Sequence, residues 1–219
     1  MSRVRQAAEG GRVVEVSPER LAGWFDGFAE RNDGIGDTTA TDTEIVVTAR
    51  NGTTATAGVP FPPLGGTGPP TVRLVVHARR SRRIGLLLVR LGAHSVGVAE
   101  NGKVVLSRTD RHLVHGRSSA GGWSQQRFAR RREGQARQAL REAADDALEV
   151  LGPRLAELDA VVLGGDRRAL DELRADRRLE PVFALAGPRI LELREPRRSV
   201  LDEAAQRARA VEIHLRDRT

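Results

Sequence analysis

Residues 83–111 read RIGLLLVRLGAHSVGVAENGKVVLSRTDR, and this stretch contains several β-strand patterns in quick succession. Its apolar runs are rich in Val and Leu, and the Asn101-Gly102 pair is typical of a two-residue hairpin turn. Together with the segment just before it, the stretch predicts four consecutive strands, over 72–78, 83–91, 95–100 and 103–111. Consecutive strands joined by short turns form an antiparallel meander.

Helical and strand patterns alternate after the meander. A Gly/Ser-rich break at 116–122 precedes a long helical pattern over 124–151, whose apolar residues recur on one face. The remaining patterns are, in order, a strand over 158–163, a helix ending near Arg174, a strand near 181–185, a helix over 197–209 and a closing strand over 211–215. We therefore predict the α/β (α+β) class, with a mixed sheet that carries helices.

The first 70 residues form a separate pattern. One apolar stripe at helical spacing indicates a helix packed on a core; its members are Leu21, Trp24, Phe25 and Phe28. Asn51-Gly52 predicts a hairpin that joins strands over 44–49 and 53–59. Because residues 60–70 are rich in Pro and Gly, we divide the chain into a small N-terminal α+β subdomain with its linker, 1–70, and a larger domain, 71–219.

Composition excludes several classes of protein. The chain has no Cys, so it is not a disulfide scaffold. The longest uncharged apolar stretch, Ile84–Val89, is far shorter than the ~20 residues that cross a bilayer, so we expect no membrane partner. Charged residues near the N-terminus occupy the place of the apolar stretch of a secretory signal. We therefore expect a cytoplasmic protein.

The positive charge of the chain is clustered. The net charge is +7, and all but one of the 36 basic Lys and Arg residues are arginines. The region from Arg108 to Arg132 holds seven arginines and a single acidic residue, Asp110. This clustering indicates a segment that faces nucleic acid or phosphate.

The segment over 115–132, HGRSSAGGWSQQRFARRR, carries the groups best suited to chemistry. Gly121 and Gly122 allow backbone torsions and a close approach that other residues forbid, so the loop can reach into a confined site. Two primary amides follow, Gln125 and Gln126. The helix that begins there presents arginines suited to holding phosphates, which are Arg127, Arg130, Arg131 and Arg132.

Residues 121–130, GGWSQQRFAR, resemble the Gly-Gly-Gln-Ser-Ala-x-Arg-Phe-x-Arg segment of archaeal and eukaryotic class 1 peptide-release factors. Within that group the chain is most similar to the Vms-like release-factor family of ribosome quality control, in its actinobacterial branch. The resemblance covers about residues 71–219 and leaves 1–70 outside. It implies a ribonuclease-H-like release-factor middle domain with a protruding loop, and the hydrolysis of peptidyl-tRNA on stalled large ribosomal subunits.

The resemblance also implies roles for single residues. Aligned without a gap, the release-factor glutamine falls on Trp123, which has no primary amide. In Vms-like members a serine precedes the displaced glutamine, so Ser124-Gln125 matches best if Trp123 is an insertion. Gln125 is therefore the expected catalytic residue, with Gln126 as the other possibility. The resemblance further assigns the loop tip Gly121, Gly122 and Ser124 to the catalytic site, and assigns RNA contacts to Arg117, Trp123, Arg127, Arg130 and Arg131.

The reaction that the resemblance implies needs no cofactor and no metal ion. Hydrolysis of the activated ester at the tRNA 3′-terminal adenosine requires a positioned water, exclusion of bulk solvent and donors for the developing oxyanion. A glutamine and backbone amides supply these. The expected partners are the large ribosomal subunit, its ribosomal RNA and peptidyl-tRNA.

Three alternatives remain open from the sequence. A nuclease that trims the tRNA 3′ end would need clustered carboxylates, and the predicted meander offers only Glu100 and Asp110. Trp123 favours a non-hydrolytic rescue module, whereas Gln125 and Gln126 argue against one. A general RNA-binding protein would keep its function without the two glutamines. Two weaker signals are a metal site at His112 and His115, and a phosphate cradle at 164–166; for the latter, helix capping by Asp166 is the simpler interpretation.

Overall fold

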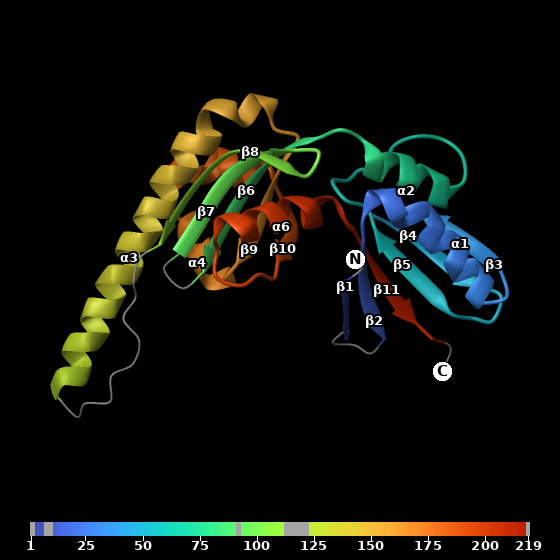
Figure 1. Ribbon diagram of the computed structural model, residues 1–219, viewed down its shortest axis with the longest axis horizontal. Coiled ribbons are helices and arrows are strands. Elements are labelled where there is room, and N and C mark those ends of the chain that lie inside the picture. The colour runs from blue at the N-terminus through green and yellow to red at the C-terminus, as the bar shows by residue number, and fades with distance from the viewer. Residues whose placement is uncertain (1–2, 7–10, 91–92, 112–122, 218–219) are drawn as a thin grey trace. The chain divides into compact units, whose positions relative to one another are not determined.

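The computed structural model describes residues 3–6, 11–90, 93–111 and 123–217. The chain divides into two compact units, Met1–Ser81 with Gln206–Thr219, and Arg82–Ala205. This division differs from the predicted one at residue 70 in two ways: residues 71–81 belong to the first unit, and so does the C-terminal strand. Each unit is built on its own sheet (Figure 1).

The first unit is a six-stranded sheet with two helices. Its elements are β1 (Arg3–Gln6), β2 (Arg12–Val16), η1 (Pro18–Arg20), α1 (Leu21–Arg31), β3 (Ile35–Ala40), β4 (Glu44–Ala49), β5 (Thr54–Gly58), α2 (Pro70–Arg79) and β11 (Val211–Arg216). The strand order is β1-β2-β11-β5-β4-β3. The C-terminal strand β11 therefore lies in the middle of this sheet, between β2 and β5.

The core of the first unit confirms the predicted aromatic stripe. Leu21, Phe25 and Phe28 of α1 are buried, and the Trp24 ring stacks on Phe28 at 5.6 Å between centroids. One prediction was wrong: residues 72–78 form the middle of helix α2 and not a strand. A helix can begin with proline at its first position, and α2 begins at Pro70 and buries Leu74, His77 and Ala78 at helical spacing.

The second unit is a five-stranded mixed sheet with helices. Its elements are β6 (Arg83–Arg90), β7 (Ala93–Glu100), β8 (Lys103–Arg111), α3 (Trp123–Leu151), η2 (Gly152–Glu157), β9 (Ala160–Gly165), α4 (Arg167–Arg174), η3 (Arg177–Leu179), α5 (Glu180–Ala184), β10 (Ala186–Leu191) and α6 (Arg198–Arg209), which continues past Ala205 into the first unit. The order is β10-β9-β6-β7-β8. This confirms the predicted α+β fold with a mixed sheet.

The second sheet combines the last three strands of the predicted meander with parallel strands. β6, β7 and β8 pair antiparallel, whereas β9 pairs parallel to both β6 and β10. Asn101 and Gly102 have φ of 51° and 80°, as the hairpin turn between β7 and β8 requires. The strand predicted near 181–185 is helix α5 instead, and the strand begins two residues after this helix ends.

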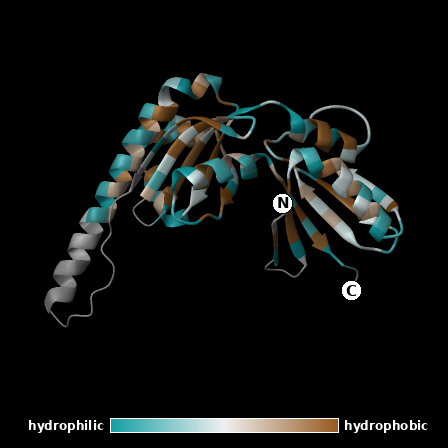
Figure 2. Cartoon of the chain, viewed as in Figure 1, coloured by the Kyte–Doolittle hydropathy of each residue, from teal (hydrophilic) through white to brown (hydrophobic). Residues whose placement is uncertain are grey.

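Helix α3 packs on the second sheet through its C-terminal half. Its buried residues Ala143, Ala147 and Leu151 share a core with Leu87, Val96 and Val98 of the sheet. Figure 2 shows hydrophobic residues concentrated on the strands of this unit. The sheet is therefore the base from which the rest of α3 projects.

Candidate functional site

Helix α3 carries the predicted site at its N-terminal end. The helix is 29 residues long and begins at Trp123. Ala139 is the first buried side chain that the structure describes along it, and residues 134–138 are exposed or half-buried. Figure 1 shows the N-terminal half of α3 extending away from the other elements of its unit. From Trp123 to Gln138 this half spans ~24 Å at the rise of an α-helix.

The start of α3 decides where the loop ends. Trp123, Ser124, Gln125 and Gln126 all lie within the first turns of the helix, one residue earlier than the predicted start at Ser124. The predicted site residues Arg117, Gly121 and Gly122 lie outside the described residues, as do His112 and His115. Successive positions of an α-helix are about 100° apart around its axis, so positions 125 and 126 are not equivalent in any one placement of the helix.

Three of the predicted RNA-contacting arginines occupy positions of α3 that share one helical face. Arg127, Arg130 and Arg131 have the i, i+3 and i+4 spacing that places residues side by side on a helix. Arg132 is about 200° from Arg130 around the axis and lies on another face. Arginine at three positions of one helical face is the pattern expected of a phosphate-binding helix.

A polar network, missed by the sequence analysis, joins α3 to the sheet through a buried His94–Asp146 pair and the exposed Arg108. His94 of β7 is only 1% exposed, and its Nε2 lies 2.8 Å from Oδ2 of Asp146 on α3. Oδ1 of Asp146 lies 3.0 Å from Nε of Arg108 on β8. Arg108 also pairs with Glu149, one turn further along α3. Two sequence signals could have pointed to this network: a histidine, His94, within an apolar strand, and an aspartate, Asp146, within an alanine-rich face of a helix.

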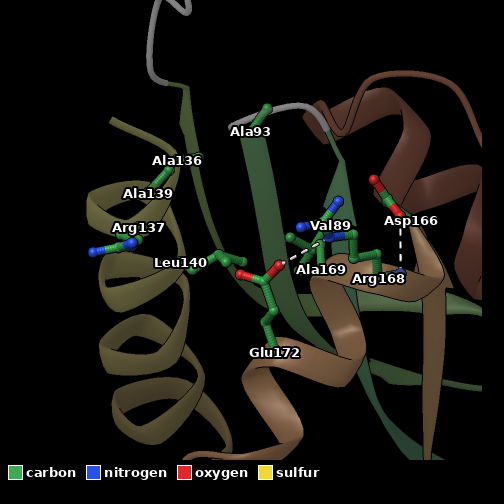
Figure 3. Close-up of a pocket in the computed structure, with 10 residues that line it drawn as sticks. All are labelled: Val89, Ala93, Ala136, Arg137, Ala139, Leu140, Asp166, Arg168, Ala169 and Glu172. Carbon is green, nitrogen blue, oxygen red and sulfur yellow. Dashed lines mark hydrogen bonds and ion pairs between the residues drawn. The ribbon is translucent and has the colours of Figure 1, made fainter. Parts of the chain in front are cut away.

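A pocket of about 290 Å³ lies between α3 and α4, where β6 and β9 end (Figure 3). Val89, Ala139, Leu140 and Ala169 give it an apolar lining, and an Arg168–Glu172 ion pair borders it. The side chain of Asp166 accepts a hydrogen bond of 2.9 Å from the backbone N–H of Arg168. This confirms that Asp166 caps α4, and its carboxylate occupies the amides that a phosphate would need.

The family model of the Actinobacteria/chloroflexi VLRF1 release factors matches residues 82–214. The chain belongs to this family. The resemblance noted from the sequence is thereby confirmed, and the match extends over the whole second unit and most of β11, a central strand of the first sheet. Membership in a release-factor family points to a role in ribosome rescue or translation termination.

Other comparisons add little to the VLRF1 match. No curated protein matches the sequence. The solved structure of S. cerevisiae Dom34, a translation termination-like factor involved in RNA quality control pathways and interacting with Hbs1, is similar over 92% of this chain and 65% of that chain, at 9% identity and a TM-score of 0.34. The family match carries the assignment, since a TM-score of this size carries no weight by itself.

Within the part of this VLRF1-family chain that the structure describes, no helix is long and apolar enough to cross a membrane. The two carboxylates considered for a nuclease are far apart. Glu100 is the last residue of β7. Asp110 lies on β8, where it is paired with His94, and His94 is near the first residue of β7. Six residues of β-strand separate the two positions by ~20 Å, so they cannot share a metal site.

Proposed function

We propose that this VLRF1-family protein is a peptidyl-tRNA hydrolase that acts on stalled large ribosomal subunits. It frees the nascent chain by hydrolysing the ester that joins the chain to tRNA, as part of ribosome quality control in the cytoplasm. One observation carries the proposal: the release-factor-like segment stands at the N-terminal end of a helix that extends well beyond its sheet. A loop on such an extension can enter a narrow site while the body of the protein stays outside.

The proposed chemistry uses the loop and the first turns of α3. The side-chain amide of Gln125 orients a water toward the ester carbonyl, and backbone N–H groups stabilise the oxyanion that develops. Glutamine does not titrate, so the proton of the attacking water passes through the 2′-hydroxyl of the terminal ribose and groups of the ribosome to the ribose 3′-oxygen. This oxygen leaves as a hydroxyl when the bond from the acyl carbon breaks. Gly121, Gly122 and Ser124 allow the backbone to approach closely enough for this contact.

Binding comes from the arginines and not from the glutamine. Arg127, Arg130 and Arg131 share one face of α3 and contact phosphates of ribosomal RNA or tRNA. Arg117 and Trp123 supply further RNA contacts, the indole by stacking on a base. The division of roles means that binding and hydrolysis can be lost separately.

The decisive experiment incubates the protein with large ribosomal subunits that carry peptidyl-tRNA and analyses both products. Ester hydrolysis yields free peptide and a tRNA with an intact 3′ end. A shortened tRNA would instead identify the nuclease, and bound subunits with uncleaved peptidyl-tRNA would identify the non-hydrolytic module that Trp123 favours. Full release by a Gln125→Ala/Gln126→Ala double variant would contradict the glutamine mechanism.

A further inference from the structure

The interface between α3 and its sheet has few long side chains that could interlock. The buried face of α3 is made mostly of alanine, at positions Ala139, Ala143, Ala144 and Ala147, each at most 4% exposed. An alanine methyl is short and has no rotamers, so it does not interlock deeply with the strands below. Packing of this kind stabilises the contact but only weakly selects one register of the helix against the sheet.

The network of His94, Asp146 and Arg108 selects one register of α3 against the sheet. Asp146 is the only charged residue among the buried side chains that the structure describes on α3. An ionised carboxylate accepts hydrogen bonds and cannot donate them, so Nε2 of His94 carries the hydrogen that it shares with Asp146. Arg108 neutralises the other oxygen of the carboxylate at 3.0 Å. Asp146 therefore makes both contacts, to Nε2 of His94 and to Nε of Arg108, only when residue 146 faces His94.

A slip of α3 along the sheet breaks this arrangement. A slip of one turn in one direction places Val150 against His94, and a slip in the other direction places Glu142, whose side chain is one methylene longer. The first leaves the buried imidazole of His94 and the buried carboxylate of Asp146 without each other, and the second changes the spacing to Arg108. Both are penalised because buried charged groups are costly when unpaired.

The network also lies far from the loop that it would control. Gln125 precedes Asp146 by ~31 Å along the helix axis. At that distance a tilt of only ~10° at the network moves the tip by ~5 Å, and a slip of one turn moves it by ~5.4 Å. Misplacing a catalytic group by as little as ~1 Å can lower a rate by about 100-fold.

We propose that His94, Asp146 and Arg108 are positioning residues that set the register and tilt of α3 and thereby place the glutamine for hydrolysis. The catalytic consequence rests on the proposed function, whereas the structural consequence does not. None of the three residues touches the substrate. They act through the helix, so their loss lowers the rate of release more than it lowers ribosome affinity.

The first test measures the position of α3 directly. The chain has no native Cys, so Lys103→Cys on β8 and Ala136→Cys on α3 take a pair of spin labels without background. Both positions are exposed. We compare the label distance in the otherwise wild-type chain, in His94→Leu, in His94→Gln and in Leu151→Ala. Gln keeps a donor near the position of Nε2, and Leu151→Ala removes packing from the end of α3 without touching the network.

We expect the His94→Leu distance to shift or broaden by several Å, and the distances in His94→Gln and Leu151→Ala to match the parent chain. An unchanged distance in His94→Leu, or an equal change in Leu151→Ala, overturns the proposal. If His94→Leu does not fold, Asp146→Asn takes its place. Asparagine keeps the acceptor for His94 but turns an N–H toward Arg108, so a change in distance is again required.

The second test measures release from large subunits carrying peptidyl-tRNA. We expect kcat to fall at least tenfold in His94→Leu and to recover in His94→Gln. In both variants the Kd for the large subunit should stay within about threefold of the wild-type value. A wild-type protein that releases no peptide refutes the proposed function, and the label distances still decide the positioning role. Shifted distances with a wild-type kcat overturn the link from position to catalysis.

Discussion

The two halves of α3 differ in what holds them. Residues 139–151 bury an alanine and leucine face on the sheet, and they are tied to it by the His94 and Arg108 contacts to Asp146. Residues 123–138 carry the glutamines and the positions of the proposed arginine face, and Ala139 is the first buried side chain that the structure describes along the helix. One helix thus has a half that contributes stability and a half that we propose contributes activity. Substitutions in the two halves should have separable effects.

The largest effect on release is expected at Gln125. Gln125→Ala should lower the rate of release at least ~100-fold, the loss typical of removing one group that stabilises the transition state. The free energy of unfolding and the Kd for large subunits should stay near wild type, because the substitution lies in the projecting half. Single-turnover release, denaturant unfolding and subunit binding measure the three quantities.

Gln126→Ala is the matched control for this substitution, because it removes the same group one residue away. We expect it to be milder, since Gln126 points about 100° from Gln125 around the helix. A collapse of release in Gln126→Ala with full activity in Gln125→Ala would reverse the assignment of the catalytic residue.

Substitutions in residues 139–151 of α3 should lower stability and leave release unchanged. Leu151 is completely buried, so Leu151→Ala should lower the free energy of unfolding by about 2–5 kcal/mol. Release per folded molecule should be unchanged, because the network that ties α3 to the sheet remains. Urea unfolding followed with a release assay on the folded fraction tests this. A release rate that fell in proportion to stability would show that the two halves are not separable.

The sequence predicted the elements that are locally strong and missed those that depend on distant contacts. The last three of the four strands predicted for the meander, α3 and the Asn101-Gly102 turn follow from periodicity and turn chemistry, and the structure has them within a few residues. Strands β1 and β3 were missed. Both lie at the edges of the first sheet, where few side chains are buried, so their apolar alternation is weak.

Tertiary packing overrode local propensity at α2. Its Val-rich sequence favours a strand, yet the buried residues Leu74, His77 and Ala78 follow helical spacing. The strand over 211–215 was predicted correctly, but its pairing with β2 and β5 could not be, since these partners lie about 150 to 200 residues earlier. The same holds for His94 and Asp146: each residue is visible in the sequence, and only the fold brings them together.

The arginine face should affect binding and not chemistry. Replacing Arg127, Arg130 and Arg131 by alanine should weaken binding of large subunits and flatten its dependence on log salt concentration by roughly 0.7–0.9 per lost phosphate contact. Arg132→Ala is the control, because it lies on another face of the helix. Affinity measured at several salt concentrations separates the two. An unchanged slope in the triple variant would contradict the phosphate contacts and leave the glutamine chemistry standing.

The smallest effect is expected at Gly134, close to where the two halves of α3 meet. A Cβ built at Gly134 has no atom within 4 Å, so alanine fits without strain and should favour the helix by about 0.5–1 kcal/mol. If the projecting half opens on its own, Gly134→Ala should slow amide hydrogen exchange over 123–133 and leave global unfolding unchanged. Gly165→Ala is the opposite case, because Gly165 has φ of +104° and its Cβ would lie 2.0 Å from the Val89 carbonyl oxygen, so that variant should be destabilised. An equal gain in global stability for Gly134→Ala would show that α3 unfolds as a single unit, and the contrast between its halves would then be one of burial only.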